Sequence, residues 1–294
     1  MVITVVSIIA YLILAPIIGG LLAGIDRVIT ARMQGRQGPP VLQPFYDVFK
    51  LTEKEAITVN KVQDFYVMCF FIFIVITGCF FFAGGDLLLV IFALTLASVF
   101  LIVAAFSSNS PYAQIGAERE LLQMMAYEPM VLLTAVGFYM FTGSFRVADL
   151  VSGLNLVYMT EGKMPFLYLI GIFIGFVFIL TIKFRKSPFD LSMSHHAHQE
   201  LVAGLKTEFS GKTLALIEVA HWYENIFLLG FVFLFFANGT WWGAAIGVVV
   251  CLLTYFLEVL IDNSFARMKW QFALKAAWIA AITAGLANII FLNF

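Results

Sequence analysis

Residues 183–224 hold most of the side chains that can take up and release protons near neutral pH. All four histidines lie in this stretch: His195, His196, His198 and His221. Glu218, His221 and Glu224 follow one another at intervals of three, so they share one face of a helix. Histidine titrates near neutral pH, and neighbouring carboxyl groups can exchange protons with it. The spacing favours a proton relay, and a fixed salt bridge between two helices is the alternative.

Three further ionisable side chains fall within apolar segments: Glu128, Glu258 and Lys275. A charged group at membrane depth is costly unless it is paired or hydrated, and it usually marks an ion or proton pathway. A structural ion pair is the alternative for Glu128, and Lys275 could instead extend to the membrane interface. The predicted proton or ion path therefore comprises Glu128, Glu218, His221, Glu224, Glu258 and Lys275.

The histidine cluster also raises the question of a metal. His195 and His198 are three apart and could ligate one ion, with Asp190 and Glu200 completing the site. A proton relay or hydrogen bonding at a partner interface is the interpretation that we favour. The three cysteines lie in apolar segments without C-x-x-C spacing, which argues against an iron–sulfur site: Cys69, Cys79 and Cys251. We expect no metal and no cofactor in this chain.

Nucleotide-binding and nucleophile motifs are absent from the sequence. An ATP-driven pump and a self-contained enzyme therefore find no support, and we expect no catalytic residue.

The composition predicts the elements that position these groups. With 62% hydrophobic and 12% charged residues, the chain is expected to be an all-α, polytopic membrane protein in a single domain, 1–294. Segments long and apolar enough to cross a bilayer as helices lie at about 3–25, 65–84, 87–106, 123–143, 165–183, 213–237, 241–261 and 271–292. The fourth is expected to be a long helix with a polar start.

The basic residues predict the orientation. Fourteen of the 17 lysines and arginines fall on one side, in or beside four loops, and only Arg146 and Lys163 lie in loops on the other. Positive residues favour the cytoplasmic side. The cytoplasmic loops are therefore expected at 26–64, 107–122, 184–212 and 262–270. Both termini would lie on the outer side of the cell membrane, opposite the cytoplasm.

The first of these loops is expected to contain an amphipathic helix. After Pro44, the apolar residues Phe45, Val48 and Phe49 recur at helical spacing, while charged residues occupy the other face. Such a helix lies along the membrane surface. It would either anchor the loop or contribute to a docking surface with loop 184–212.

Four motifs in this order resemble the eight-span membrane subunit that anchors the peripheral arm of respiratory complex I. They are GPPVLQPFYDVFKLTEKE, ERELLQMMAYEP, SPFDL with HQELVAGLKTEFSG, and ARMKWQFALKAAW. The resemblance runs from about residue 3 to 290. The stretches SHHAHQELV and IEVAHWYE are similar to the corresponding subunit of Ech-type energy-converting [NiFe] hydrogenases. This departs from the quinone-using branch.

The hydrogenase resemblance implies a set of partners. Ferredoxin would supply electrons to the complex, and proton reduction would be coupled to H⁺ or Na⁺ translocation. The [NiFe] centre and [4Fe-4S] clusters would belong to partner subunits, namely the hydrogenase large subunit, a small iron–sulfur subunit and a ferredoxin-like iron–sulfur subunit. An antiporter-like membrane subunit would adjoin this chain in the lipid bilayer, with no role for nucleic acid.

The resemblance also assigns residues. Glu128, Glu218, Glu224 and Lys275 match the family's polar path. A junction with the peripheral arm is implied for Asp47, Lys50, Glu55, Arg119, Asp190, His195, His196, His198, Glu200 and Glu208. The alternatives are a quinone-site subunit of a complex I-like NADH dehydrogenase, a subunit of a related sulfur-reducing complex, or a stand-alone cation/proton antiporter.

The orientation is testable by thiol labelling. Single cysteines placed near Lys54 and near Lys206, in a variant without the native cysteines, should react with an impermeant maleimide only from the cytoplasmic side. Inside-out and right-side-out vesicles provide the measurement. Labelling of either position from outside would contradict the orientation.

Overall fold

Long apolar helices make up the protein. The computed structural model describes residues 2–55, 57, 60–152, 164–186, 188–194 and 199–292, and these residues contain no β-strand. Six of the long helices are α1 (Val2–Met33), α3 (Lys61–Phe82), α4 (Leu87–Phe106), α5 (Pro111–Thr142), α8 (Gly211–Leu234) and α9 (Trp241–Ser264). A seventh runs from α10 (Trp270–Ala280) through a π-helical turn (Ala281–Leu286) into α11 (Ala287–Leu292). All seven are long and apolar enough to cross a membrane. The protein is a polytopic all-α membrane protein, as predicted.

The fifth predicted span, 165–183, differs from the prediction. Only Ile170–Lys183 (α7) is α-helical there, and it follows a 3₁₀ turn at Pro165–Leu167. Fourteen residues extend only about 21 Å at 1.5 Å each, which is short of an apolar core of about 30 Å. The non-helical part is held by protein, since the Phe166 amide donates to the Phe235 carbonyl at 2.8 Å. Irregular backbone is tolerated at membrane depth where protein covers it.

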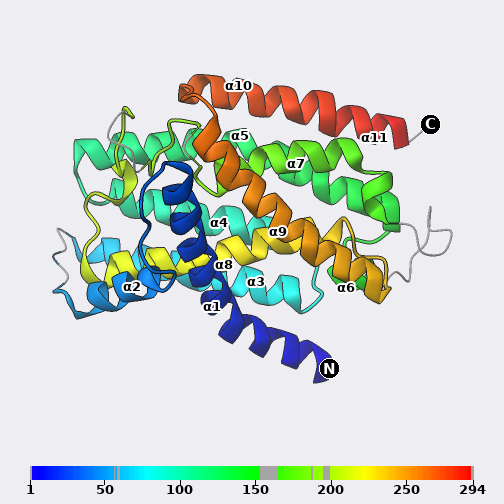
Figure 1. Cartoon of the computed structure of the whole chain (residues 1–294), viewed down its shortest axis with the longest axis horizontal. Coiled ribbons are helices and arrows are strands. Elements are labelled where there is room, and N and C mark those ends of the chain that lie inside the picture. Colours follow the sequence, from blue (N-terminus) through cyan, green and yellow to red (C-terminus); the bar gives the residue numbers. More distant parts are fainter. Residues whose placement is uncertain are drawn as a thin grey trace.

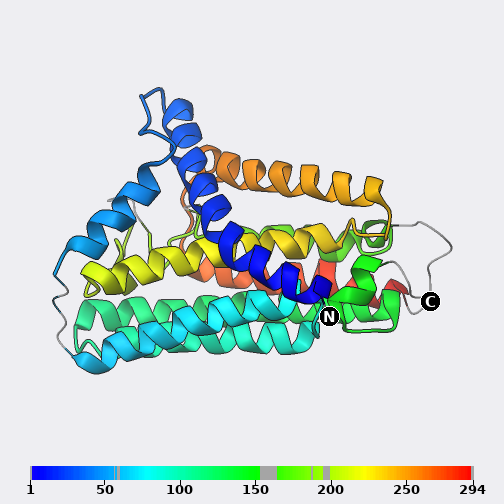
Figure 2. The ribbon, with the colours of Figure 1, turned by 90° about the horizontal axis from the view of Figure 1, so that it is seen from below.

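The helices are arranged around α8, which packs on α1, α3 and α9. Helices α3, α4 and α5 form one layer, and α9 lies on the opposite side of α8 (Figure 2). α1 crosses the others obliquely, and α10 and α11 lie along one edge (Figure 1). The fourth predicted span is the long helix α5, which continues through Pro129.

Aromatic rings fill the interior. Phe231 on α8 stacks on Phe81 of α3 with ring centroids 5.2 Å apart, and on Phe176 of α7 at 5.7 Å. Phe138 of α5 lies 4.7 Å from Phe235. Lipid tails are as apolar as these side chains, so close packing rather than exclusion from water must hold the helices together. Interlocked rings provide that packing.

Small residues on α1 let the first loop return against it. The amphipathic helix α2 (Gln43–Glu53) packs on α1 and α8, at the predicted position. A Cβ at Gly20 would lie 2.4 Å from the Phe45 ring, and one at Gly24 would lie 1.8 Å from the Val41 carbonyl oxygen. Only glycine permits this approach, which brings the first loop next to α8.

The four loops predicted to be cytoplasmic meet at one end of the bundle, here called the basic end. Ser210 donates to the Ile57 carbonyl at 3.0 Å, Tyr112 to the Val202 carbonyl at 3.0 Å, and the Asp190 amide to the Met268 carbonyl at 3.1 Å. The first and last loops also meet, because Gln34 donates to Asn263 at 3.1 Å. A short α-helix, α6 (Val147–Ser152), lies at the other end, beside the N-terminus (Figure 2).

Candidate functional site

Three cations at the end of α7 pair with acids on three other helices. The Lys183 ammonium lies 3.2 Å from Glu224 of α8, and each side chain is only 5% exposed. The next two cations follow within three residues. Arg185 lies 3.7 Å from Glu120 of α5, and Lys186 lies 2.5 Å from Asp26 of α1. We call Lys183, Arg185 and Lys186 the α7 cations.

The two lysines among the α7 cations also contact aromatic faces. The Lys183 ammonium is 4.1 Å from the centre of the Tyr127 ring, and that of Lys186 is 5.5 Å from the Tyr255 ring. Rings attract cations through their negative faces, most strongly when water is excluded. Each of the two lysines thus contacts both a carboxylate and a ring.

A polar cavity of about 230 Å³ adjoins these pairs. It lies between α1, the end of α7, α8 and α9, and its lining includes the α7 cations with Asp26, Glu218, His221, Glu224 and Asp262. Glu218 pairs with Lys206 at 2.5 Å, and the His221 ring packs edge-on against Phe70. The predicted face of Glu218, His221 and Glu224 therefore opens onto one cavity, in which each of the two glutamates has a lysine partner.

Glu258 of α9 is buried differently. Its side chain is fully enclosed, and neither carboxyl oxygen has a hydrogen-bond partner of normal geometry among the described residues. Thr181 and Lys186 lie near enough to act on its charge. A buried carboxyl without a bonded cation is costly in its charged form, so Glu258 is the acid of this region best suited to hold a proton.

A second cluster, centred on Arg119 of α5, lies at the basic end. Its guanidinium donates to Asp190 at 2.8 Å and to Glu200 at 3.0 Å, and it lies 5.8 Å from the Trp270 ring. Burial raises the pKa of the Asp190 carboxyl above its ordinary value. The charge of Glu200 acts in the same direction, whereas Arg119 opposes both. The Glu200 side chain is 56% exposed and is available to a partner.

An ion pair between α5 and the residues after α7 joins the two clusters. Glu120, next to Arg119 in sequence, pairs with Arg185 and also accepts a hydrogen bond from Ser192. Arg185 itself has a φ of +57°, a left-handed conformation that is uncommon for a residue other than glycine. Strained backbone of this kind persists where surrounding contacts hold it, here the contact of its side chain with Glu120.

The remaining predicted residues lie outside the cavity. Glu128 is half-buried on α5 and feels the charge of Lys183. Lys275 is exposed on α10 and has no ion pair among the described residues, so its part in the path stays a prediction. Among the residues predicted to form the junction, Asp47 bonds to Arg27 at 2.6 Å. Exposed or half-buried side chains are found for Lys50, Glu55 and Glu208.

The pKa of Asp47 illustrates the weaker electrostatics of the surface helix. Partial burial raises it, but hydrogen bonds from Arg27 and Gln43 and the charge of Lys50 outweigh that effect, so the net pKa is lowered. This carboxylate stays charged and keeps α2 attached to α1.

His195, His196 and His198 lie outside the described residues, so their predicted roles stay predictions. Within the described part of the chain, no three His, Cys, Asp or Glu side chains gather as metal ligands. The sequence reasoning missed several site residues altogether: Asp26, Glu120, Lys206 and, as pairing groups, the α7 cations. A lysine at the end of an apolar span was the available signal, because a buried cation requires an acid.

Comparison with known proteins places these features in a family. The family model described as NADH dehydrogenase matches residues 5–293. The chain belongs to the NADH dehydrogenase family. A similar protein is one of the subunits of the NADH-quinone oxidoreductase of Carboxydothermus hydrogenoformans, which is 29% identical over 100% of this chain and 88% of that protein.

Other relatives of this NADH dehydrogenase family chain come from hydrogenase systems. The C component of hydrogenase-4 of Escherichia coli is 27% identical, with 93% of this chain and 91% of that protein covered. Formate hydrogenlyase subunit 4 of E. coli is 26% identical, over 88% and 89%. Among solved structures, a chain of the membrane-bound sulfane sulfur reductase, an archaeal respiratory membrane complex, matches with a TM-score of 0.84, 26% identity and coverage of 97% and 99%.

The Lys183–Glu224 pair should dominate the stability of the cavity. Removing one partner, in Lys183→Met or Glu224→Leu, should lower the free energy of unfolding by about 3–5 kcal/mol, because the other charge is left buried. The double variant should recover much of this loss. Equilibrium unfolding in mixed SDS and mild detergent measures it.

The exposed Arg27–Asp47 pair supplies the matched control. Arg27→Gln and Asp47→Asn should each cost no more than about 1 kcal/mol, since water screens this pair. Equal effects at the two pairs would contradict the burial of the Lys183–Glu224 pair.

Proposed function

We propose that this chain is the membrane subunit of a ferredoxin-dependent, energy-converting [NiFe] hydrogenase. It would anchor the hydrogenase arm at its basic end and pass coupling from that junction to an antiporter-like membrane subunit. The chain would bear no catalytic residue and no redox cofactor, with the [NiFe] centre and [4Fe-4S] clusters in its partners. The cytoplasmic face of the cell membrane is the proposed location of the basic end.

The observation that carries the proposal is the ion-paired cavity inside a membrane protein of a redox-complex family. Lys183–Glu224, Lys186–Asp26 and Lys206–Glu218 converge on it from four parts of the chain. In each pair, the charged forms of the carboxylate and the ammonium are stable only while the two groups remain in contact. If a neighbouring charge separates them, the carboxylate can take up a proton or the ammonium can release one. His221 lies among them, and histidine is the side chain that ordinarily titrates near neutral pH.

Glu258 would extend the path onto α9. It belongs to α9, and Lys186 acts on both Glu258 and Asp26. Movement of Lys186 toward Glu258 would favour release of a proton there, and its return to Asp26 would favour uptake. Glu128, which feels the charge of Lys183, is the proposed branch toward α5.

The proposed docking surface is built on Arg119, Asp190 and Glu200. Arg119 holds the loop after α7 against α5, while Glu200 remains mostly exposed. The hydrogenase assignment is supported by the relatives from hydrogenase-4 and formate hydrogenlyase, and by the histidine-containing stretches of this sequence.

A subunit of a sulfur-reducing complex is the second candidate. It is favoured by the fold match to the sulfane sulfur reductase, which extends over nearly all of both chains. The purified native complex distinguishes the candidates when hydrogen evolution, polysulfide reduction and quinone reduction are assayed side by side. Hydrogen evolution from reduced ferredoxin supports the hydrogenase proposal, and polysulfide or quinone reduction in its place would overturn it.

The relay is tested most sharply at Glu258. Glu258→Gln keeps the shape of the side chain and leaves no bonded cation without a partner, so the complex should assemble normally. Coupled hydrogen evolution should fall at least tenfold or lose its response to uncouplers. Assembly is measured by the yield of intact complex, and coupling by ion uptake into vesicles.

Two further variants separate transfer from structure. Glu218→Gln should lower coupled turnover as Glu258→Gln does, with a smaller loss of yield than Glu224→Gln, because the Lys206–Glu218 pair is partly exposed whereas Lys183 is left buried and unpaired. Glu53→Gln, on the exposed side of α2, is the control and should change neither quantity. Normal coupled turnover in both Glu258→Gln and Glu218→Gln would refute the relay.

Docking is tested at the Arg119 cluster. Glu200→Lys reverses an exposed charge, so the soluble hydrogenase subunits should dissociate in washed membranes while the membrane chain remains. Asp190→Asn and His198→Gln should weaken retention or uncouple the complex. Retention is measured by the hydrogenase activity left on the membrane. Full retention and coupling in all three variants would count against this surface.

A further inference from the structure

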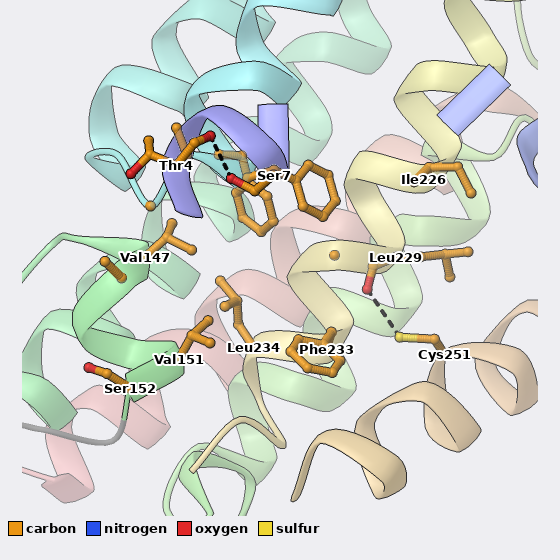
Figure 3. A pocket seen from close by; sticks show the side chains of 16 residues that line it. Thr4, Ser7, Val147, Val151, Ser152, Ile226, Leu229, Phe233, Leu234 and Cys251 are labelled. Carbon is orange, nitrogen blue, oxygen red and sulfur yellow. Dashed lines mark hydrogen bonds between the residues drawn. The ribbon is translucent and has the colours of Figure 1, made fainter. Parts of the chain in front are cut away.

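An apolar groove of about 610 Å³ opens at the end of the bundle opposite the basic end. Its walls come from the start of α1, the end of α3, α6, and the facing surfaces of α8 and α9. Figure 3 shows Phe233 and Leu234 of α8 on the side of Val147 and Val151 of α6, while Leu229 points toward the side of Cys251 on α9. No charged side chain is among the described residues that line it.

The groove and the polar cavity are lined by neighbouring residues of α8. Asn225 of α8 lines the polar cavity, and Ile226, the next residue, lines the groove. The Cys251 thiol, which lines the groove, donates to the Leu229 carbonyl at 3.2 Å (Figure 3). The volume lies within the range of about 300–1,000 Å³ that is usual for ligand pockets. An apolar space of this kind excludes water and favours an apolar occupant.

The polar groups of the groove lie toward its outer end. Thr4, Ser7 and Ser152 belong to α1 and α6, which start or lie at that end of the bundle. Arg146, directly before α6, is exposed and forms no ion pair within the described residues. Its backbone is fixed, since the Arg146 amide donates to Ser144 at 3.1 Å and the Val147 amide to the Gly85 carbonyl at 2.9 Å.

We propose that this groove binds one acyl chain of an anionic phospholipid, whose phosphate is held by Arg146. The bilayer is the medium that faces an opening between membrane-spanning helices, so the occupant comes from it. The apolar walls suit a hydrocarbon chain, which they would hold by close packing rather than by exclusion from water. Arg146 directly precedes Val147, which lines the groove, and its exposed guanidinium suits a phosphate, with which arginine forms two parallel hydrogen bonds.

The test uses the full chain in its complex, reconstituted in phosphatidylcholine vesicles. The probe is a phosphatidylglycerol that carries a photoreactive diazirine near the end of one acyl chain. After irradiation, peptide mass spectrometry should locate adducts at Leu229–Leu234 and Cys251. When a detergent wash precedes irradiation, these adducts should persist, whereas adducts on the lipid-facing surface of α9 should disappear because the probe there is washed away.

Three variants decide the outcome. Val151→Trp fills the mouth and should reduce groove adducts at least fivefold, while Val249→Trp, on the exposed face of α9, should leave them unchanged. Arg146→Gln should abolish the preference for phosphatidylglycerol over a phosphatidylcholine probe. Groove adducts that are absent, or equal in Val151→Trp, would overturn the proposal. So would crosslinking of benzoylphenylalanine at position 151 to another subunit, because a protein helix would then fill the groove.

Discussion

The α7 cations must be neutralised inside an apolar bundle, and the arrangement of the helices follows from this need. Lys183, Arg185 and Lys186 lie close together in sequence, yet their acids come from α8, α5 and α1. Leaving one buried charge unpaired costs several kcal/mol. Three such pairs therefore bring the end of α7 to the centre of the basic end, which explains why a helix too short to span the membrane is nevertheless tightly placed.

The helices themselves could be predicted because lipid imposes a simple rule. Every backbone amide must be bonded within its segment, so an apolar run of sufficient length is a helix. The rule is incomplete for 165–183. Hydropathy measures composition alone and cannot detect the 3₁₀ turn that begins at Pro165. In that turn the Phe166 amide donates to the carbonyl of Phe235, which is distant in sequence. The surface helix after Pro44 was predictable from its spacing, but its contact with α8 was not.

The candidate site was predictable where its residues are neighbours along one helix. Glu218, His221 and Glu224 do open onto a common cavity, since their spacing alone determines their shared face. Their partners were not predictable. Lys183 and Glu224 are 41 residues apart, and Arg119 and Asp190 are 71 apart. Which cation meets which acid depends on how α5, α7 and α8 pack, and no local pattern records that packing.

The Lys186–Asp26 pair has a consequence for how the protein is made. The two residues are 160 positions apart, so at about 5–20 residues per second the ribosome completes Asp26 roughly 8 to 32 seconds before Lys186. During that interval the acid near the end of α1 lacks this counter-ion. This end of the first helix must therefore remain hydrated during that interval. The helix can reach its final position only after most of the chain has been inserted. Assembly of the basic end is accordingly a late event in biogenesis, although Asp26 is synthesised long before Lys186.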